Sequence, residues 1–253
     1  MADARPGISE TAVRIAEWLE CDVYLEHDQS LLIKEGGKGV CAALVDYWAA
    51  TILRSGSETP HILFHSELKE AGSNHILKFR HGLSSDNFPD GLLYSLKCYH
   101  DDSIRGGPVS LGLELKPIIG GDFLGAMAGD DFNHLLNQIS KLIEKIGPGV
   151  YRLALNVNVG IDEHIPGHAI GIYKSGIKAE ECVYDPNAGI AICYESNKVA
   201  DTLKTFFTDD ETFGRRGYNS YRCANLEQYH LAAAWNPEEF SKIHKKAIDN
   251  KLA

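Results

Sequence analysis

The chain has 253 residues, of which 44% are hydrophobic and 24% are charged, and its formal net charge at pH 7 is -10. These proportions are typical of a globular protein and exclude a disordered chain, a collagen and a coiled coil. The acidic balance argues against a surface that attracts nucleic acid or anionic lipid as a whole. The length suits one large domain, or one domain with an extra subdomain, with a substantial hydrophobic core.

Standard membrane-targeting signals are missing from the sequence. No apolar stretch approaches the roughly 20 residues of a membrane-spanning helix. The segment from Met1 to Glu10 is polar and lacks the apolar core of a signal peptide. Residue 2 is alanine and not the glycine that N-myristoylation requires. We therefore expect no membrane span and no Sec-type signal peptide.

The cysteines of the chain do not form a recognisable metal or disulfide framework. They occur at positions 21, 41, 98, 182, 193 and 223. None of them forms a CxxC pair, and zinc-ribbon spacing is absent. In a long chain without a signal peptide, free thiols in a reducing compartment are the expected state. We predict neither a metal nor another cofactor.

The first part of the chain is predicted to be helical. Ser9 is a suitable N-cap for a helix over about 10–21. Residues 28–39 contain three glycines and predict a loop. The clearest helix follows, because apolar residues recur at steps of three and four from Val40 to Ile52. This pattern places Cys41 in the first turn of a buried helix.

The second part of the chain is predicted to be mainly a sheet. Residues 57–129 indicate only short helices or strands joined by long loops, and a helix is expected over about 131–146. From residue 150 the hydrophobic period changes from that of a helix to the period of two that strands show. We expect strands over 150–159, 168–174, 179–185, 190–194 and 218–224, and helices that begin near Ser196 and at Asn236-Pro237.

These elements define an α+β fold. Hairpins dominate the second part and alternating βαβ units are missing, which argues against a doubly wound parallel sheet. We find no internal repeat and no linker. The predicted organisation is an N-terminal segment with one helix over 1–27, followed by one domain over 28–253.

Cys41 is the first candidate for catalysis. A thiolate is the reactive form of cysteine, and a helix N-terminus stabilises an anion by about 0.3–1 kcal/mol. That contribution is too small to activate the thiol fully, so a histidine partner is needed. The alternative is that Cys41 is a small buried core residue, which is the commonest fate of cysteine.

A predicted hairpin brings a histidine and a carboxylate together. Gly176 suits the first central position of a type II′ turn. A two-residue loop over 176–177 or a four-residue loop over 175–178 sets His168 directly opposite Asp185. Opposed residues have Cβ atoms about 4.5–5.5 Å apart, so the two can form the base and orienting carboxylate of a triad. A three-residue loop would change this register.

Rival assignments find little support in the sequence. In the predicted register Cys182 points to the opposite face from Asp185 and His168, which indicates a core residue. His164 and His168 are four residues apart, but Pro166 between them makes a helical metal pair unlikely to form. The sequence contains neither a GxSxG motif of serine hydrolases nor a Walker A phosphate loop.

Three segments in this order resemble the YopT/AvrPphB family of bacterial effector cysteine proteases, which have a papain-like fold. In that family a cysteine opens the central helix, a histidine lies on a strand, and an aspartate belongs to an Asp-Pro-Asn-x-Gly type motif. Each motif is short, but together they span about 39 to 189. The matching segments are Gly39-Val40-Cys41-Ala42-Ala43-Leu44 with Trp48 a turn later, Gly167-His168-Ala169-Ile170, and Tyr184-Asp185-Pro186-Asn187-Ala188-Gly189.

The resemblance implies a papain-like catalytic domain over 28–253, with its central helix packed on an antiparallel sheet. It also implies that Cys41 is the nucleophile, His168 the general base and then acid, and Asp185 the residue that orients the imidazole. Asn187 and Trp48 have simpler interpretations, as a turn former and a core residue.

One position departs from the papain-like pattern. Those enzymes use a side-chain amide shortly before the cysteine to stabilise the oxyanion, whereas this chain has Glu35 and Gly36 there. An ionised glutamate cannot donate a hydrogen bond. The Cys41 backbone N–H supplies one donor, and Gln29 and Lys38 are candidates for the second.

The leading hypothesis is a papain-like thiol protease that hydrolyses peptide bonds in a protein target. The resemblance implies a bacterial effector, secreted by a non-Sec system into the host cytoplasm, that acts on a host protein. A second hypothesis uses the same triad for deamidation, transglutamination or acyl transfer. A third is a catalytically inactive binding module. The sequence leaves the substrate and the oligomeric state open.

Overall fold

The structure is a computed structural model that describes residues 10–27, 41–54, 60–74, 111–120, 124–125, 132–156, 167–208 and 221–233. The chain divides into two compact units, which are described separately. The first unit comprises Met1–Asp28 and Pro117–Gln228, and the second comprises Gln29–Lys116 and Tyr229–Ala253. The sequence predicted a single domain after an N-terminal segment. That the two units act as one catalytic domain stays a prediction.

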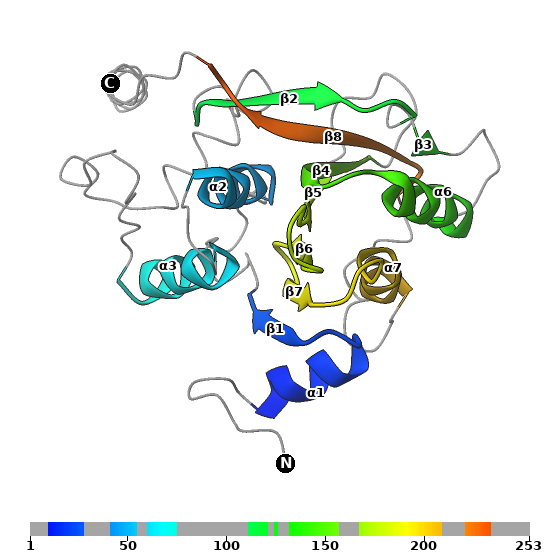
Figure 1. Ribbon diagram of the computed structural model, residues 1–253. Coiled ribbons are helices and arrows are strands. Elements are labelled where there is room, and N and C mark those ends of the chain that lie inside the picture. Colours follow the sequence, from blue (N-terminus) through cyan, green and yellow to red (C-terminus); the bar gives the residue numbers. More distant parts are fainter. Residues whose placement is uncertain are drawn as a thin grey trace. The chain divides into compact units, whose positions relative to one another are not determined.

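An antiparallel sheet forms the centre of the first unit (Figure 1). Its strands follow the order β1-β7-β6-β5-β4-β8, and the short β3 also pairs with β8. The β5–β6 and β6–β7 connections are both hairpins between neighbouring antiparallel strands. The strands are β1 (Val23–Glu26), β3 (Leu124–Gly125), β4 (Gly149–Asn156), β5 (His168–Lys174), β6 (Glu181–Asp185), β7 (Gly189–Cys193) and β8 (Cys223–Leu231), whose last residues belong to the second unit.

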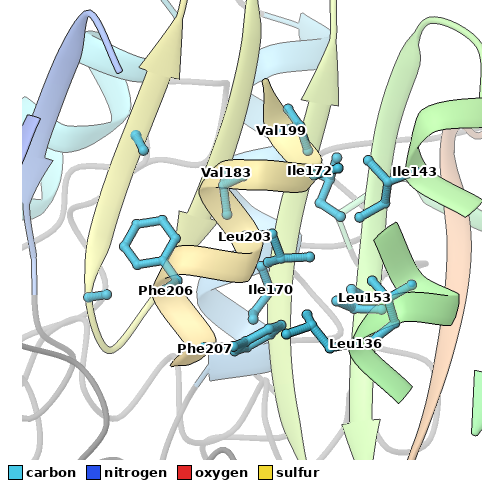
Figure 2. Close-up of a cluster of buried hydrophobic side chains, with 14 of the residues drawn as sticks. Leu136, Ile143, Leu153, Ile170, Ile172, Val183, Val199, Leu203, Phe206 and Phe207 are labelled. Atoms are coloured by element: carbon cyan, nitrogen blue, oxygen red, sulfur yellow. The ribbon is translucent and has the colours of Figure 1, made fainter. Parts of the chain in front are cut away.

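Two helices cover one face of this sheet, α6 (Phe132–Lys145) and α7 (Val199–Thr208) (Figure 1). Apolar residues at helical spacing on both helices pack on alternate residues of the central strands. Figure 2 shows this core, with side chains from both helices meeting those of β4, β5 and β6. The labelled members are Leu136, Ile143, Leu153, Ile170, Ile172, Val183, Val199, Leu203, Phe206 and Phe207.

One cross-strand ion pair joins the sheet to both helices. Lys174 lies opposite Glu181 in the β5–β6 ladder, and Lys174 Nζ is 3.6 Å from Glu181 Oε1. Lys174 also donates to the carbonyl of Ile143 near the end of α6, at 3.1 Å. Glu181 accepts a hydrogen bond from the backbone N–H of Val199, the first residue of α7, at 3.0 Å. A cation thus meets a helix C-terminus and an anion meets a helix N-terminus, which the helix dipoles favour.

The N-terminal helix α1 (Glu10–Trp18) also belongs to the first unit. A Schellman motif ends it, in which the N–H of Cys21 bonds the carbonyl of Ala16 and the N–H of Glu20 bonds that of Glu17. Glu20 has a left-handed φ of 52°. The helix is therefore shorter than the predicted 10–21.

The second unit contains two helices, α2 (Cys41–Arg54) and α3 (Pro60–Asn74), and the strand β2 (Leu113–Pro117), which pairs with β8. Trp48 of α2 is fully buried, and its indole N–H donates to Nδ1 of His61 on α3 at 3.3 Å. The hydroxyl of Tyr229, where β8 enters this unit, donates to the buried carboxylate of Asp46. Trp48 is thus a core residue, as its simpler interpretation predicted.

The α+β class is confirmed, as are most elements after residue 130. The strand β5 has the predicted bounds, and α2, α6, β6 and β7 differ from theirs by one or two residues. The strand predicted over 218–224 instead begins at Cys223 and runs to Leu231, because polar residues such as Glu227 and Gln228 hide its alternation. The sequence did not predict β1 or define α3. The helix expected from Asn236 and the loop over 28–39 lie outside the described residues.

Candidate active site

Cys41 is the first residue of α2, as predicted. Its side chain is buried, and the first turn of the helix contains no acidic residue that would oppose a thiolate. The dipole at this end of a 14-residue helix favours an anion. The helix is held in the second unit by Leu44, Trp48 and Asp46, all of which are buried. A rigid helix therefore fixes the position of the thiol.

His168 and Asp185 meet in the first unit, at the start of β5 and the end of β6. Nε2 of His168 is 2.9 Å from Oδ1 of Asp185, and the two side chains are 3% and 0% exposed. A carboxylate can only accept, so Nε2 is the nitrogen that carries the proton. In the neutral ring the lone pair is then on Nδ1, which is the nitrogen that can accept a proton from a thiol.

The pair forms in a register two residues from the predicted one. The ladder sets Gly171 opposite Tyr184 and Lys174 opposite Glu181, which is a wider turn than the predicted two-residue or four-residue loop. The cause is Ser175, whose N–H bonds the carbonyl of Glu180 and whose Oγ accepts hydrogen bonds from two backbone N–H groups within the turn. The prediction that His168 and Asp185 lie directly opposite each other was therefore wrong.

The histidine and carboxylate still meet because a shift of two residues keeps each side chain on its face. Val183 of the same strand belongs to the core cluster, so alternation sets Asp185 on that face and Cys182 on the other. His168 reaches Asp185 as a diagonal neighbour on the adjacent strand. The diagonal separation is within reach of a long side chain.

A turn after β6 fixes the carboxylate. Oδ1 of Asp185 accepts a second hydrogen bond from the backbone N–H of Asn187 at 2.8 Å, and the N–H of Ala188 bonds the carbonyl of Asp185 at 2.9 Å. This is the Asx-turn geometry that Asp-Pro-Asn sequences favour. Tyr24 of β1 donates from its hydroxyl to the carbonyl of Ala188. The backbone of Asn187 thus has the turn-forming role that its simpler interpretation predicted.

Two glycines of the candidate motifs have a structural reason. A Cβ on Gly189, whose φ is +130°, would lie 2.5 Å from the carbonyl oxygen of Leu25 in β1. A Cβ on Gly167 would lie 2.9 Å from Oδ1 of Asn156 and 3.0 Å from the carbonyl oxygen of Leu155. A side chain at position 189 would clash with this backbone, whereas one at position 167 would need small shifts of Asn156 and of the Leu155 carbonyl. Both glycines therefore allow close backbone packing beside the histidine–carboxylate pair.

The sequence reasoning missed one neighbour of the pair, Tyr221. Its ring is nearly parallel to the imidazole of His168, with 22° between the planes and 6.5 Å between the centroids. The residue precedes β8 and lies 53 positions from His168 along the chain, so no local pattern could have revealed the contact.

Four other described cysteines are poor nucleophiles. Burial raises the pKa of the Cys21 thiol from 9.0 to about 12, and nearby Cys193 adds to the effect. Burial also raises the pKa values of Cys182, Cys193 and Cys223. All of these thiols stay protonated at neutral pH, whereas the reactive form of cysteine is the thiolate.

Three residues considered in the sequence lie outside the part of the chain that the structure describes. Gln29 and Lys38, the candidate oxyanion donors, lie outside the described residues, as does Cys98. In the described part of the chain, no three His, Cys, Asp or Glu side chains gather in a group that could hold a metal ion. No helix in that same part is long and apolar enough to cross a membrane.

Solved structures similar to this chain include the Pseudomonas avirulence protein AvrPphB, with 16% identity, a TM-score of 0.44, and coverage of 76% of this chain and 92% of that one. Another is PatoxP, a cysteine protease-like domain of the Photorhabdus asymbiotica toxin PaTox, with 13% identity, a TM-score of 0.46, and coverage of 91% and 65%. No protein-family model and no curated protein sequence matches the chain. The expected structural similarity to AvrPphB is thus found. At these TM-scores, function has to be inferred from this chain's own residues.

Proposed function

We propose that the protein is a cysteine protease in which Cys41, His168 and Asp185 form the catalytic triad. The observation that carries the proposal is the buried His168–Asp185 hydrogen bond of 2.9 Å, which is the base and orienting pair that an activated thiol requires. Cys41 at the N-terminus of α2 supports it, because this is where a helix best stabilises a thiolate.

In the proposed reaction, Nδ1 of His168 takes the thiol proton of Cys41 while Asp185 holds the Nε2 proton. The thiolate attacks the carbonyl carbon of a peptide bond, and the Cys41 backbone N–H donates to the oxyanion that forms. The C–N bond breaks and the imidazolium protonates the leaving amine, which leaves a thioester on Cys41. Water then attacks the thioester with Nδ1 as the base, releasing the acid product and the thiol.

Asp185 is suited to a role in orienting the ring. Its buried carboxylate accepts from His168 and from the backbone of Asn187 through the same oxygen, so the turn fixes its direction. An ionised neighbour also favours the imidazolium that forms when the thiol gives up its proton. Both effects favour the thiolate–imidazolium pair before the substrate binds.

The target of the proposed protease is a protein, and we extend the family resemblance to propose a host protein reached by bacterial secretion. The second oxyanion donor is proposed to be Gln29 or Lys38, which the chain carries shortly before Cys41.

The same acyl-enzyme can serve a different reaction. If ammonia leaves from a glutamine side chain, water as the acceptor gives deamidation and an amine gives transglutamination. Mass spectrometry of an intact target distinguishes the alternatives, because hydrolysis shortens the chain whereas the others change its mass without cleavage. An inactive binding module would do neither.

Selective alkylation tests the triad without knowledge of the substrate. We expect a small chloroacetamide to label Cys41 at about pH 5.5, where ordinary thiols are protonated. A Cys98→Ser background removes the cysteine outside the described residues. Since the other four thiols have raised pKa values, tryptic mass spectrometry should find the label on Cys41 alone.

The control variants separate the triad from general effects. His168→Ala should slow the labelling by about 10²–10⁴-fold, the usual contribution of a positioned base, and Asp185→Asn should slow it less. His134→Ala, which changes an exposed histidine on α6, should leave the rate unchanged. Labelling of Cys41 no faster than that of a free thiol at this pH would contradict the proposal and favour the inactive binding module.

A further inference from the structure

We propose that Tyr221 is a positioning residue for His168, holding the plane of its imidazole so that Nε2 stays directed at Asp185. The inference rests on the proposed function for its catalytic meaning. Its structural content, the orientation of the ring, concerns the first unit alone and can be tested separately.

The ring of Tyr221 lies beside the imidazole of His168. The two rings are 22° from parallel with centroids 6.5 Å apart, which lies within the range of offset-stacked aromatic pairs. Asp185 holds one edge of the imidazole through a hydrogen bond, which directs Nε2 but restrains rotation about the bond direction less well. An aromatic ring against the face opposes that rotation. The edge contact and the face contact together define one orientation.

The backbone beside Tyr221 is bonded to β4, the strand that also pairs with His168. Leu155 at the end of β4 lies opposite His168 in the ladder. The next residue, Asn156, accepts a hydrogen bond at its carbonyl from the N–H of Arg222, at 2.9 Å. His168 and Arg222, the residue after Tyr221, thus contact neighbouring residues of one strand, which brings Tyr221 close to His168.

Two further contacts make this arrangement rigid. The guanidinium of Arg222 donates to the carbonyl of Tyr221 at 3.0 Å, which restrains the backbone just before β8. The ring of Tyr221 also packs against the core cluster. On the other side, Gly167 lets the backbone before His168 lie directly against Asn156. The end of β4 is therefore a common support for the imidazole and the ring that covers it.

The experiment uses the full chain with ¹⁵N-labelled histidine in a Cys41→Ala background, and compares Tyr221→Phe with Tyr221→Leu. Phenylalanine keeps the ring and leucine removes it from a half-buried position. We expect the Tyr221 ring current to shift the His168 carbon-bound protons in the parent and in Tyr221→Phe, and this contribution to be lost in Tyr221→Leu. We also expect the hydrogen-bonded Nε2 proton signal to be sharp in the first two and exchange-broadened in the third.

The catalytic consequence is measured by alkylation of Cys41 in the chain that retains it. Tyr221→Leu should slow labelling by about 2-fold to 10-fold, the rate equivalent of an aromatic contact, and Tyr221→Phe should stay within about 2-fold of the parent. A cooperative unfolding transition and a circular dichroism spectrum like that of the parent show that the leucine variant is folded.

The outcomes distinguish this inference from the proposed function. An unchanged Nε2 proton signal in Tyr221→Leu would overturn the inference, whatever the labelling shows. A broadened signal with unchanged rapid labelling would reduce Tyr221 to a structural neighbour and also overturn it. If the parent Cys41 is not labelled rapidly, the proposed function fails, and the proton signal alone decides whether Tyr221 orients the ring.

Discussion

The two units place their candidate catalytic residues by different means. In the second unit, Cys41 owes its position to its own helix, whose periodicity and start are local properties of 14 residues. In the first unit, the His168–Asp185 pair depends on strands and turns that are distant in sequence, including the hydroxyl contact from Tyr24 to Ala188. A nucleophile on a helix can therefore be predicted locally, whereas its partners require correct long-range pairing.

The largest expected effect concerns the thiol of Cys21, beside β1 of the first unit. Its pKa is about 12 in the folded chain against 9.0 for an ordinary thiol. Below about pH 9 both states are protonated, so stability is unaffected. Above it the unfolded chain ionises and the folded chain does not, so stability falls until the pH reaches the folded pKa, by a total on the order of 4 kcal/mol.

Denaturant unfolding of the parent and Cys21→Ala at about pH 8.5 and about pH 10.5 checks this linkage. We expect the parent to lose about 2 kcal/mol more than the variant over this interval. Groups such as lysine and tyrosine titrate in both proteins and cancel in the comparison. Equal losses would show that Cys21 ionises as easily in the folded chain as in the unfolded one.

The next effect tests how closely β1 must approach the turn that carries Asp185. Gly189→Ala should lower the free energy of unfolding by about 3 kcal/mol, because a Cβ at this positive φ meets the backbone of Leu25. Gly147→Ala is the matched control, since a Cβ there has no atom within 4 Å, and it should change stability by less than about 0.5 kcal/mol. Similar losses in thermal or denaturant unfolding for the two variants would contradict this account.

The smallest effect compares a tyrosine hydroxyl in each unit. Tyr229→Phe should destabilise the second unit by about 2 kcal/mol, because its hydroxyl donates to the buried carboxylate of Asp46. Tyr151→Phe removes a hydrogen bond to the neutral carbonyl of Gly147 in the first unit and should cost about 1 kcal/mol. Chemical denaturation measures both, and a larger loss for Tyr151→Phe would reverse the ranking.

The sequence predicted much of what local patterns determine. The start of α2 at Cys41, the bounds of β5 and the amphipathic helix α6 all follow from periodicity and end signals. The strand β1 escaped prediction because four residues are too few to show a period. In α3, polar residues interrupt the apolar pattern, so periodicity did not reveal the helix.

The sequence predicted which residues belong to the candidate site better than it predicted their geometry. Alternation put His168 and Asp185 on one face, and this property survives a shift of two residues. The exact offset depended on hydrogen bonds to Ser175 in the turn, for which the sequence allowed several loop lengths. Tyr221 comes from a different part of the chain, so only the folded structure could bring it to the imidazole.

The ion pair between Lys174 and Glu181 distinguishes two registers that the apolar pattern cannot separate. Sliding β6 by two residues would leave every side chain on its own face, but Lys174 would then lie opposite Ala179 and Glu181 opposite Ile172. The buried carboxylate of Glu181 would lose its ion-pair partner, which is destabilising. Charged residues far from the candidate site thus select the offset at which His168 and Asp185 are diagonal neighbours and are not directly opposed.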